Sequence, residues 1–292
     1  MNINKQIYNL IKKIFSIENS ANKTHKVVII LGIRCKYKVF KLYSKLRNQM
    51  MNKIKYDSSS LIKPTDKVLV IAPHPDDEVI GCGGIIAKYS SQIDVLCINS
   101  SGVKYEWNVE SAEEIAQIRC DEFYNVMKFA GINKSYIAKI WGIPPMFEDI
   151  KSNINNYLKN INLKDYDVIF IPHQFDGHRE HRFVGNYLVK KLLKKNGFKK
   201  DLKIVRYEVW GTLQAPNYYE DITNFVDKKR ELIDLYVSRN KAHYADRILA
   251  LNYYRAIIAS FKDVNSFAEA FCVQSIQDYL REKDDRSWSK EW

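Results

Sequence analysis

The stretch that decides the fold is residues 67–78, which read Lys-Val-Leu-Val-Ile-Ala-Pro-His-Pro-Asp-Asp-Glu. Its first six residues are almost continuously apolar and have the length of a single strand, as expected where helices cover both faces of a sheet. Pro73 ends the apolar run, and the acidic residues after it suit the first turn of a helix. A buried strand that passes through a short polar loop into a helix is typical of an α/β fold.

Strand and helix patterns also alternate along the rest of the chain after residue 78. Apolar runs predict further strands over residues 93–98, 136–140, 167–171 and 202–209. Apolar periodicity predicts helices over residues 85–90, 111–130, 150–161 and 182–194, and a helical tail from about residue 227 onward. The alternation predicts βαβ units, and therefore an α/β fold with a Rossmann-like, mostly parallel sheet flanked by helices.

The composition excludes several classes of protein. Of the 292 residues, 46% are hydrophobic and 27% are charged, which is an ordinary globular balance and excludes a wholly disordered chain. No apolar run reaches about 18 residues, so a polytopic membrane protein is excluded too. The five cysteines are widely spaced without a Cys-x-x-Cys pair, and the first residues do not resemble a secretory signal. We therefore expect a reduced, cytoplasmic protein.

The positive charge is concentrated at the start of the chain. Residues 1–56 hold thirteen Lys and Arg and one acidic residue, whereas the remaining residues hold equal numbers of basic and acidic side chains. Residues 57–65 contain three serines and Pro64, as a linker does. We expect a basic, partly flexible N-terminal extension over residues 1–60 and one domain over residues 61–292. The extension is either a solvated tail or a contact to an anionic membrane surface; a role in binding nucleic acid is disfavoured because the domain itself is neutral.

Two polar loops follow predicted strands and hold four of the six histidines, at residues 73–78 and 172–182. In open α/β sheets, active sites lie beyond the carboxyl ends of the strands. The sequence therefore predicts that these two loops form the active site.

The first loop has the residues of a metal site. His74 and Asp77 are three apart, so a single turn brings an imidazole and a carboxylate together, and both are ligands of first-row metals. Asp76 lies between them in sequence, points elsewhere and is a candidate base, while Glu78 is a candidate partner for a ligand. The alternative is an acidic helix cap without a metal. A cap explains the acids but not His74 between two prolines.

The second loop offers two histidines at the start of the next helix. His178 and His181 are also three apart, and one of them would complete the metal site while the other faces the substrate. His173 and Asp176 lie just upstream as candidate partners. Glu180 is either an acid of the helix first turn or a group that hydrogen-bonds a ligand.

These two motifs resemble the PIG-L/LmbE-like N-acetylglucosaminyl deacetylase superfamily. The resemblance extends over roughly residues 64–275. The matching pieces are Ala72–Glu78 with Gly81–Gly84, Gly177–His181 with Val184 and Gly185, the Arg-x-x-Glu segment Arg119–Glu122, and Tyr253–Arg255 and Ala268–Phe271, which are expected in C-terminal helices. The resemblance implies the Rossmann-like fold and a hydrolase that removes acetyl groups from amino sugars.

The resemblance also implies a role for each site residue. A zinc ion, with Fe²⁺ as the alternative, would be held by His74, Asp77 and His181. Asp76 would be the general base for attack of a metal-bound water on the amide. His178 would polarise the amide carbonyl or protonate the leaving amine, and Arg119 would contact the substrate. Zinc lowers the pKa of bound water to about 7, which suits the hydrolysis of an unreactive acetamide.

One departure from the family pattern concerns the second motif. The family usually has His-Pro-Asp-His, whereas this chain has His178-Arg179-Glu180-His181. Glu180 keeps the carboxylate and adds a methylene, and Arg179 replaces a proline. Neither change removes an expected ligand.

The function expected from the sequence is zinc-dependent removal of an N-acetyl group from an amino sugar or its conjugate. The family's chemistry and the basic extension favour a nucleotide-linked or lipid-linked sugar in bacterial surface-polysaccharide biosynthesis. The enzyme would be cytoplasmic or peripheral at the inner membrane face. The alternatives are an amidase on another acyl-amine, such as a thiol-sugar conjugate or an antibiotic precursor, and an inactive sugar-binding subunit.

Overall fold

The computed structural model divides the chain into two units, residues 1–55 and 56–292. It describes residues 60–99, 112–140, 158, 161–238, 243–261 and 263–282, together with three short strands before residue 39. The helix predicted over residues 150–161 lies largely outside the described residues.

The first unit contains a three-stranded antiparallel sheet in the order β1-β2-β3. Its strands are β1 (Phe15–Asn19), β2 (His25–Ile30) and β3 (Ile33–Lys38). The basic extension therefore contains paired strands, and its partial flexibility and its membrane contact stay predictions.

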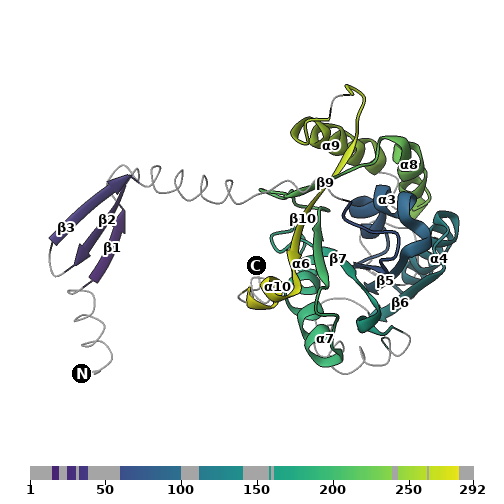
Figure 1. Ribbon diagram of the computed structural model, residues 1–292, viewed down its shortest axis with the longest axis horizontal. Coiled ribbons are helices and arrows are strands. Elements are labelled where there is room, and N and C mark those ends of the chain that lie inside the picture. Colours follow the sequence, from purple (N-terminus) through teal and green to yellow (C-terminus); the bar gives the residue numbers. More distant parts are fainter. Residues whose placement is uncertain are drawn as a thin grey trace. The chain divides into compact units, whose positions relative to one another are not determined.

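The second unit is built on a seven-stranded sheet with the order β6-β5-β4-β7-β8-β10-β9 (Figure 1). The strands are β4 (Val68–Ala72), β5 (Ile93–Asn99), β6 (Lys134–Ile140), β7 (Val168–Pro172), β8 (Lys203–Tyr207), β9 (Tyr218–Asp221) and β10 (Ala268–Ser275). The first five of these pair in parallel, and β10 runs antiparallel to both β8 and β9. The predicted α/β fold with a mostly parallel sheet is confirmed.

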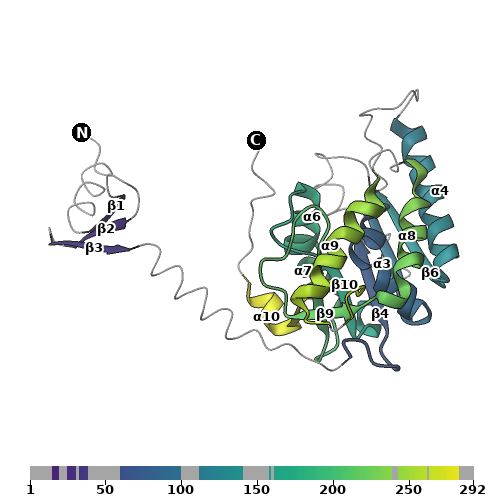
Figure 2. The same ribbon diagram turned by 90° about the horizontal axis from the view of Figure 1, so that it is seen from above.

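Helices cover both faces of this sheet (Figures 1 and 2). They are α3 (Asp77–Tyr89), α4 (Ala112–Ala130), α6 (Arg179–Phe183), α7 (Val189–Asn196), α8 (Val226–Asp234), α9 (Tyr244–Ile258) and α10 (Ile276–Arg281). A π-helical turn, Val184–Leu188, joins α6 to α7. Short 3₁₀ turns lie at Ser90–Gln92, Leu163–Asp165 and Thr223–Phe225.

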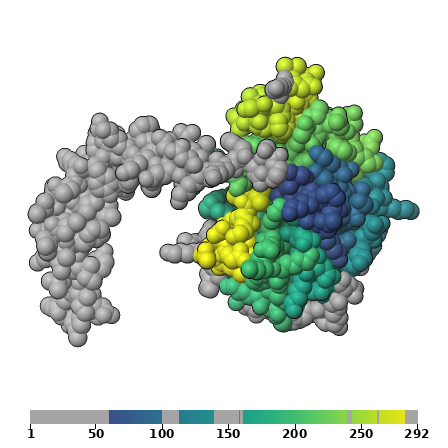
Figure 3. Space-filling view, in the orientation of Figure 1, coloured from purple at the N-terminus to yellow at the C-terminus, as the bar shows by residue number. Residues whose placement is uncertain are grey.

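Successive residues of the central strand enter two different hydrophobic cores. Val68 and Val70 of β4 pack in the core under α3, α4, α8 and α9, whereas Leu69 and Ile71 pack in the core under α6, α7 and α10. Successive side chains of a strand point to opposite faces, so a strand with a core on each face must be apolar throughout. Figure 3 shows α3, α4, α8 and α9 side by side on one face of the unit.

Two glycines let α3 approach its neighbours closely. A Cβ on Gly81 would lie 2.3 Å from the Tyr207 ring, and one on Gly84 would lie 2.3 Å from Ile222. The Gly-Cys-Gly-Gly segment is therefore needed for packing, because any larger side chain would push α3 away. Cys82 has non-helical backbone angles, so α3 is broken in its middle.

The helical tail predicted from residue 227 is wrong over residues 268–275. Ala268–Phe271 belongs to β10, a buried strand, although α8, α9 and α10 are helices. Ala and Glu favour helix locally, but pairing with both β8 and β9 overrides that preference. The prediction also placed two helix starts too late, since α3 begins at residue 77 and α6 at residue 179.

Candidate metal centre and active site

The sheet order brings the two polar loops together. Strands β4 and β7 are parallel neighbours, so their carboxyl ends lie at the same edge of the sheet. His74 follows β4, whereas His181 lies in α6 after β7. Their ring centroids are 5.2 Å apart, although 107 residues separate them in sequence.

Three buried atoms of His74, Asp77 and His181 face one another at nearly equal distances. Asp77 Oδ2 lies 3.1 Å from His74 Nδ1 and 3.0 Å from His181 Nε2, and the two nitrogens are 3.2 Å apart. Ligands at zinc–ligand distances near 2.05 Å in a tetrahedral shell are about 3.3 Å apart. The three atoms therefore fit one face of such a shell.

The chemistry of these atoms also fits a cation. Asp77 Oδ1 is buried and has no hydrogen-bond partner among the residues that the structure describes. Carboxylates of Asp76, Asp176 and Glu180 are buried close by, with at most 5% of each residue exposed. Buried carboxylates need paired positive charge, and a divalent cation at the three facing atoms would supply it.

In the trio of His74, Asp77 and His181, the ring nitrogen of each histidine that faces away from the other two residues contacts a carboxylate. His74 Nε2 contacts Glu180 through a short hydrogen bond, and Asn99 Nδ2 donates to the same Glu180 oxygen at 2.9 Å. His181 Nδ1 lies 3.1 Å from Asp176 Oδ1. Carboxylates in this position fix the ring orientation of metal-binding histidines. The extra methylene of Glu180 thus gives it the reach to His74.

Charge interactions in the trio shift several pKa values. Burial raises the pKa of Asp77, but the charge and hydrogen bond of His181 outweigh it and hold that pKa well below its usual range. Burial lowers the pKa of His181, yet Asp77 and Asp176 outweigh it and raise the pKa to about 10. Burial also acts against ionisation of Glu180, but His74 lowers the pKa of Glu180 to about 2. The site therefore strongly favours positive charge at its centre.

Asp76 stands at the entrance of α3 with an unusual backbone. Its φ is 109°, a value that side-chain-bearing residues seldom adopt. Asp76 Oδ1 is 3.4 Å from the Arg119 guanidinium, which also donates to the Pro75 carbonyl. Glu78 accepts from the Asp76 amide at 3.2 Å and from the Tyr236 hydroxyl. Strained backbone held in this way is common at functional sites.

His178 lies beside the trio. Its ring centroid is 4.9 Å from that of His74 and 4.8 Å from that of His181, and ligand atoms of all three histidines lie within 4.8 Å of one another. Burial and the neighbouring imidazoles lower its pKa to about 4. The Asp176 carboxylate accepts from the His178 amide at 2.8 Å and so fixes the backbone there.

The structure gathers all nine predicted site residues around one place, but two have partners other than those expected. Arg119 is buried, and its contacts are to Pro75 and Asp76, so its substrate contact stays a prediction. Glu78 contacts the Asp76 backbone rather than a ligand side chain. His173 bonds the Gly211 carbonyl at 2.8 Å, outside the trio.

Sequence reasoning missed three residues next to the site. Asn99 ends β5 and bonds Glu180, and the rule that sites lie at strand ends could have found it. Tyr236 reaches Glu78 from the end of α8, and Trp210 donates its amide to Asp176 at 3.0 Å. Neither has a sequence signal, because both come from distant parts of the chain.

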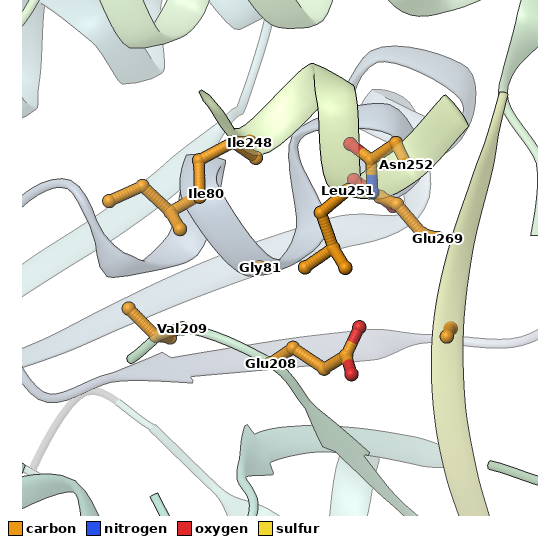
Figure 4. Close-up of a pocket in the computed structure, with 9 residues that line it drawn as sticks. Ile80, Gly81, Glu208, Val209, Ile248, Leu251, Asn252 and Glu269 are labelled. Carbon is orange, nitrogen blue, oxygen red and sulfur yellow. The ribbon is translucent and has the colours of Figure 1, made fainter. Parts of the chain in front are cut away.

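A small pocket lies elsewhere, between α3, α9, β10 and the segment after β8 (Figure 4). It is lined by Ile80, Gly81, Glu208, Val209, Ile248, Leu251, Asn252, Glu269 and Ala270. The three histidines do not line it, so this pocket is separate from the candidate metal centre.

Comparison with known proteins agrees with the motifs. Residues 69–192, which contain both polar loops, match the PIG-L family, described as GlcNAc-PI de-N-acetylase. The matched segment, less than half of the chain, is thus similar to the PIG-L family. It is 24% identical over 156 residues to diacetylchitobiose deacetylase of Thermococcus kodakarensis, covering 51% of this chain and 57% of that relative. The match thus spans little more than half of the relative's length.

Solved structures of two other proteins share the fold of this chain. One is N,N'-diacetylchitobiose deacetylase from Pyrococcus horikoshii, with a TM-score of 0.65, 20% identity and coverage of 85% of this chain and 97% of that one. The other is the 4-carboxy-2-hydroxymuconate hydratase GalB from Pseudomonas putida, with a TM-score of 0.56, 19% identity and coverage of 72% and 96%. Since the two differ in activity, the likeness shows the fold alone.

Among the residues that the structure describes, no helix combines the length and the apolar character needed to cross a bilayer.

Proposed function

We propose that this protein is a metal-dependent N-deacetylase acting on an N-acetylated amino sugar. One observation carries the proposal. Donor atoms of His74, Asp77 and His181 face one another at 3.0–3.2 Å, at the carboxyl ends of β4 and β7. A trio of two imidazoles and a carboxylate leaves a coordination position open for reaction, as catalytic zinc sites do.

In this proposal His74, Asp77 and His181 hold the metal, with Zn²⁺ as the expected ion and Fe²⁺ as the alternative. When bound, such an ion polarises a carbonyl and makes a nearby water more acidic. Glu180 and Asp176 contact the ring nitrogens of His74 and His181 that face away from the metal position. They keep the coordinating nitrogens pointed at a single position.

Asp76 is the proposed general base. Its carboxylate lies beside Arg119, whereas that of Asp77 faces the two histidines, so the two acids serve different purposes. Arg119 lies beside the Asp76 carboxylate, which would accept a proton from water. Asp76 would then pass this proton to the departing amine.

His178 is the proposed electrophile. The centroid of its ring lies within 5 Å of the ring centroids of both histidine ligands. An N–H of this ring would donate to the amide oxygen as negative charge develops on it, which is usually a large contribution to catalysis.

The substrate proposal rests on the family and on its deacetylase relatives. The expected substrate is an N-acetylated amino sugar or its conjugate, with surface-polysaccharide biosynthesis as the expected pathway and the cytoplasm or inner membrane face as the location. A panel of acyl-amines separates this proposal from an amidase on another substrate and from an inactive sugar-binding subunit.

The test is acetate release from a panel of N-acetyl sugars by the purified full chain, with and without a chelator. Asp76→Asn should lower turnover by about 10²–10⁴-fold while elemental analysis finds the metal content unchanged. His181→Ala should lose both metal and activity. Wild-type turnover that is indifferent to chelator, or full turnover by Asp76→Asn, would contradict the proposal.

A further inference from the structure

Two large aromatic side chains are exposed, one in the second polar loop (residues 172–182) and one in contact with that loop. Phe175 is 67% exposed and Trp210 is 42% exposed, although rings of this size are normally well buried. Trp210 packs against Tyr244 at the start of α9, with ring centroids 5.3 Å apart. Tyr244 thus supports the Trp210 ring at an interplanar angle of 59°, while 42% of Trp210 stays exposed. An exposed indole held in this way offers apolar surface to a ligand.

Trp210 is attached directly to the candidate metal centre. Its amide donates to Asp176 Oδ2 at 3.0 Å, and the other oxygen of Asp176 is the one beside His181. A Cβ built on Gly177 would lie 2.9 Å from the Trp210 carbonyl, so Trp210 packs tightly on the residue before His178. A single carboxylate therefore fixes both the metal-binding imidazole and the backbone that carries the exposed ring.

We propose that Trp210, supported by Tyr244, forms a stacking subsite for a second sugar ring next to the acetylated one. The inference rests on the proposed function and narrows its substrate to an oligosaccharide of at least two pyranose rings. The C–H face of a pyranose is apolar and suits the face of an indole. Because the Trp210 backbone is already fixed, little conformational entropy is lost when the sugar binds.

Trp210 could also stack on a nucleobase, but that ligand would bring a diphosphate close to the Asp176 carboxylate that accepts from the Trp210 amide. A neutral second pyranose brings no charge to this position. Binding of a UDP-sugar is therefore the alternative outcome of the test.

The first arm of the test compares kinetics on the metal-loaded full chain with N-acetylglucosamine, N,N'-diacetylchitobiose and UDP-N-acetylglucosamine. Trp210→Ala should raise KM for the disaccharide by about tenfold and leave kcat/KM for the monosaccharide within about twofold. Trp210→Phe should restore most of the loss. Tyr254→Ala, which removes a ring that is 55% exposed on α9, is the matched control and should change neither substrate.

The second arm is calorimetry with the unreactive product chitobiose and with glucosamine, which needs no turnover. The wild-type protein should bind the disaccharide about tenfold more tightly than the monosaccharide, and Trp210→Ala should abolish this preference. An unchanged preference in Trp210→Ala, or a loss confined to the UDP-sugar, overturns the stacking subsite while leaving the deacetylase proposal intact. Absence of acetate release by the wild-type protein overturns the deacetylase proposal, and calorimetry then still decides the subsite.

Discussion

At the scale of single residues, the candidate site depends on pairs of groups in which one fixes the other. Glu180 and Asp176 hold the rings of His74 and His181, and Arg119 lies against Asp76. Their effect is to fix tautomers and orientations, which is why a conservative change in one of them should alter metal binding without unfolding the chain.

Glu180→Gln tests this support. The amide can still reach His74 but carries no charge, so the metal dissociation constant should rise by about 10–100-fold. Competition with a fluorescent chelator measures that constant. Glu113→Gln, an exposed position at the start of α4, is the matched control and should leave it unchanged. An unaltered dissociation constant in Glu180→Gln would show that Glu180 is only an acid of the helix first turn.

At the scale of elements, the break in α3 is held by a fully buried ion pair. Lys229 and Glu269 are 0% and 1% exposed, with Nζ and Oε1 2.7 Å apart. Lys229 donates to the Ile80 carbonyl, while Glu269 accepts from the amides of Gly84 and Ile85. The pair therefore satisfies backbone groups that the break at Cys82 leaves without helical partners. The shorter first segment of α3 begins at Asp77.

Lys229→Met should lower the free energy of unfolding by about 3–5 kcal/mol, because it leaves Glu269 buried without its partner. Urea denaturation measures the change. Lys199→Met removes a partly exposed lysine paired with Asp167 and should cost at most about 1 kcal/mol. If the two variants lost equal stability, the buried pair would not be the element that holds the break.

At the scale of the whole molecule, the candidate metal centre joins two halves of the sheet. His74 and Asp77 follow β4, whereas His181 follows β7, and each half alone lacks part of the trio. A ligand that binds only the assembled site stabilises the fold by mass action. Metal binding and global stability should therefore be coupled.

Zinc at a hundred times its dissociation constant should stabilise the wild-type protein by about 2.7 kcal/mol. The melting temperature, followed by circular dichroism during titration with zinc and then with chelator, measures this effect. The melting temperature of His181→Ala should not rise with zinc. A rise of equal size in His181→Ala would place the stabilising metal at some other position.

The basic N-terminal segment makes a separate prediction for the whole chain. Each lysine near an anionic membrane contributes about 1 kcal/mol, so replacing Lys12, Lys13, Lys26 and Lys36 by glutamine should weaken binding to phosphatidylserine vesicles by roughly a thousandfold. Vesicle sedimentation measures it. Equal substitutions at Lys128, Lys134, Lys191 and Lys194 are the control. Equal sedimentation of both variants would exclude residues 1–56 as the membrane contact.

The sequence by itself determined the α/β fold and the two loops of the candidate site. Apolar strands such as 68–72 follow from local pattern, because a strand between two helical layers has no polar face. His74 and Asp77, three residues apart, likewise form a local unit whose relation needs no tertiary contact. Local pattern therefore sufficed for the fold class, whereas the choice of His181 over His178 as the expected ligand came from the family resemblance.

Only the tertiary structure decided how these residues are supported. Residues 268–271 have a local helical preference, yet they form a strand because β8 and β9 lie on either side. Glu180 reaches His74, and Trp210 reaches Asp176, through contacts between segments that are far apart in sequence. Such partners are set by the order and register of strands across the sheet. No local pattern encodes that order, because it depends on which segments pack together most favourably over the whole chain.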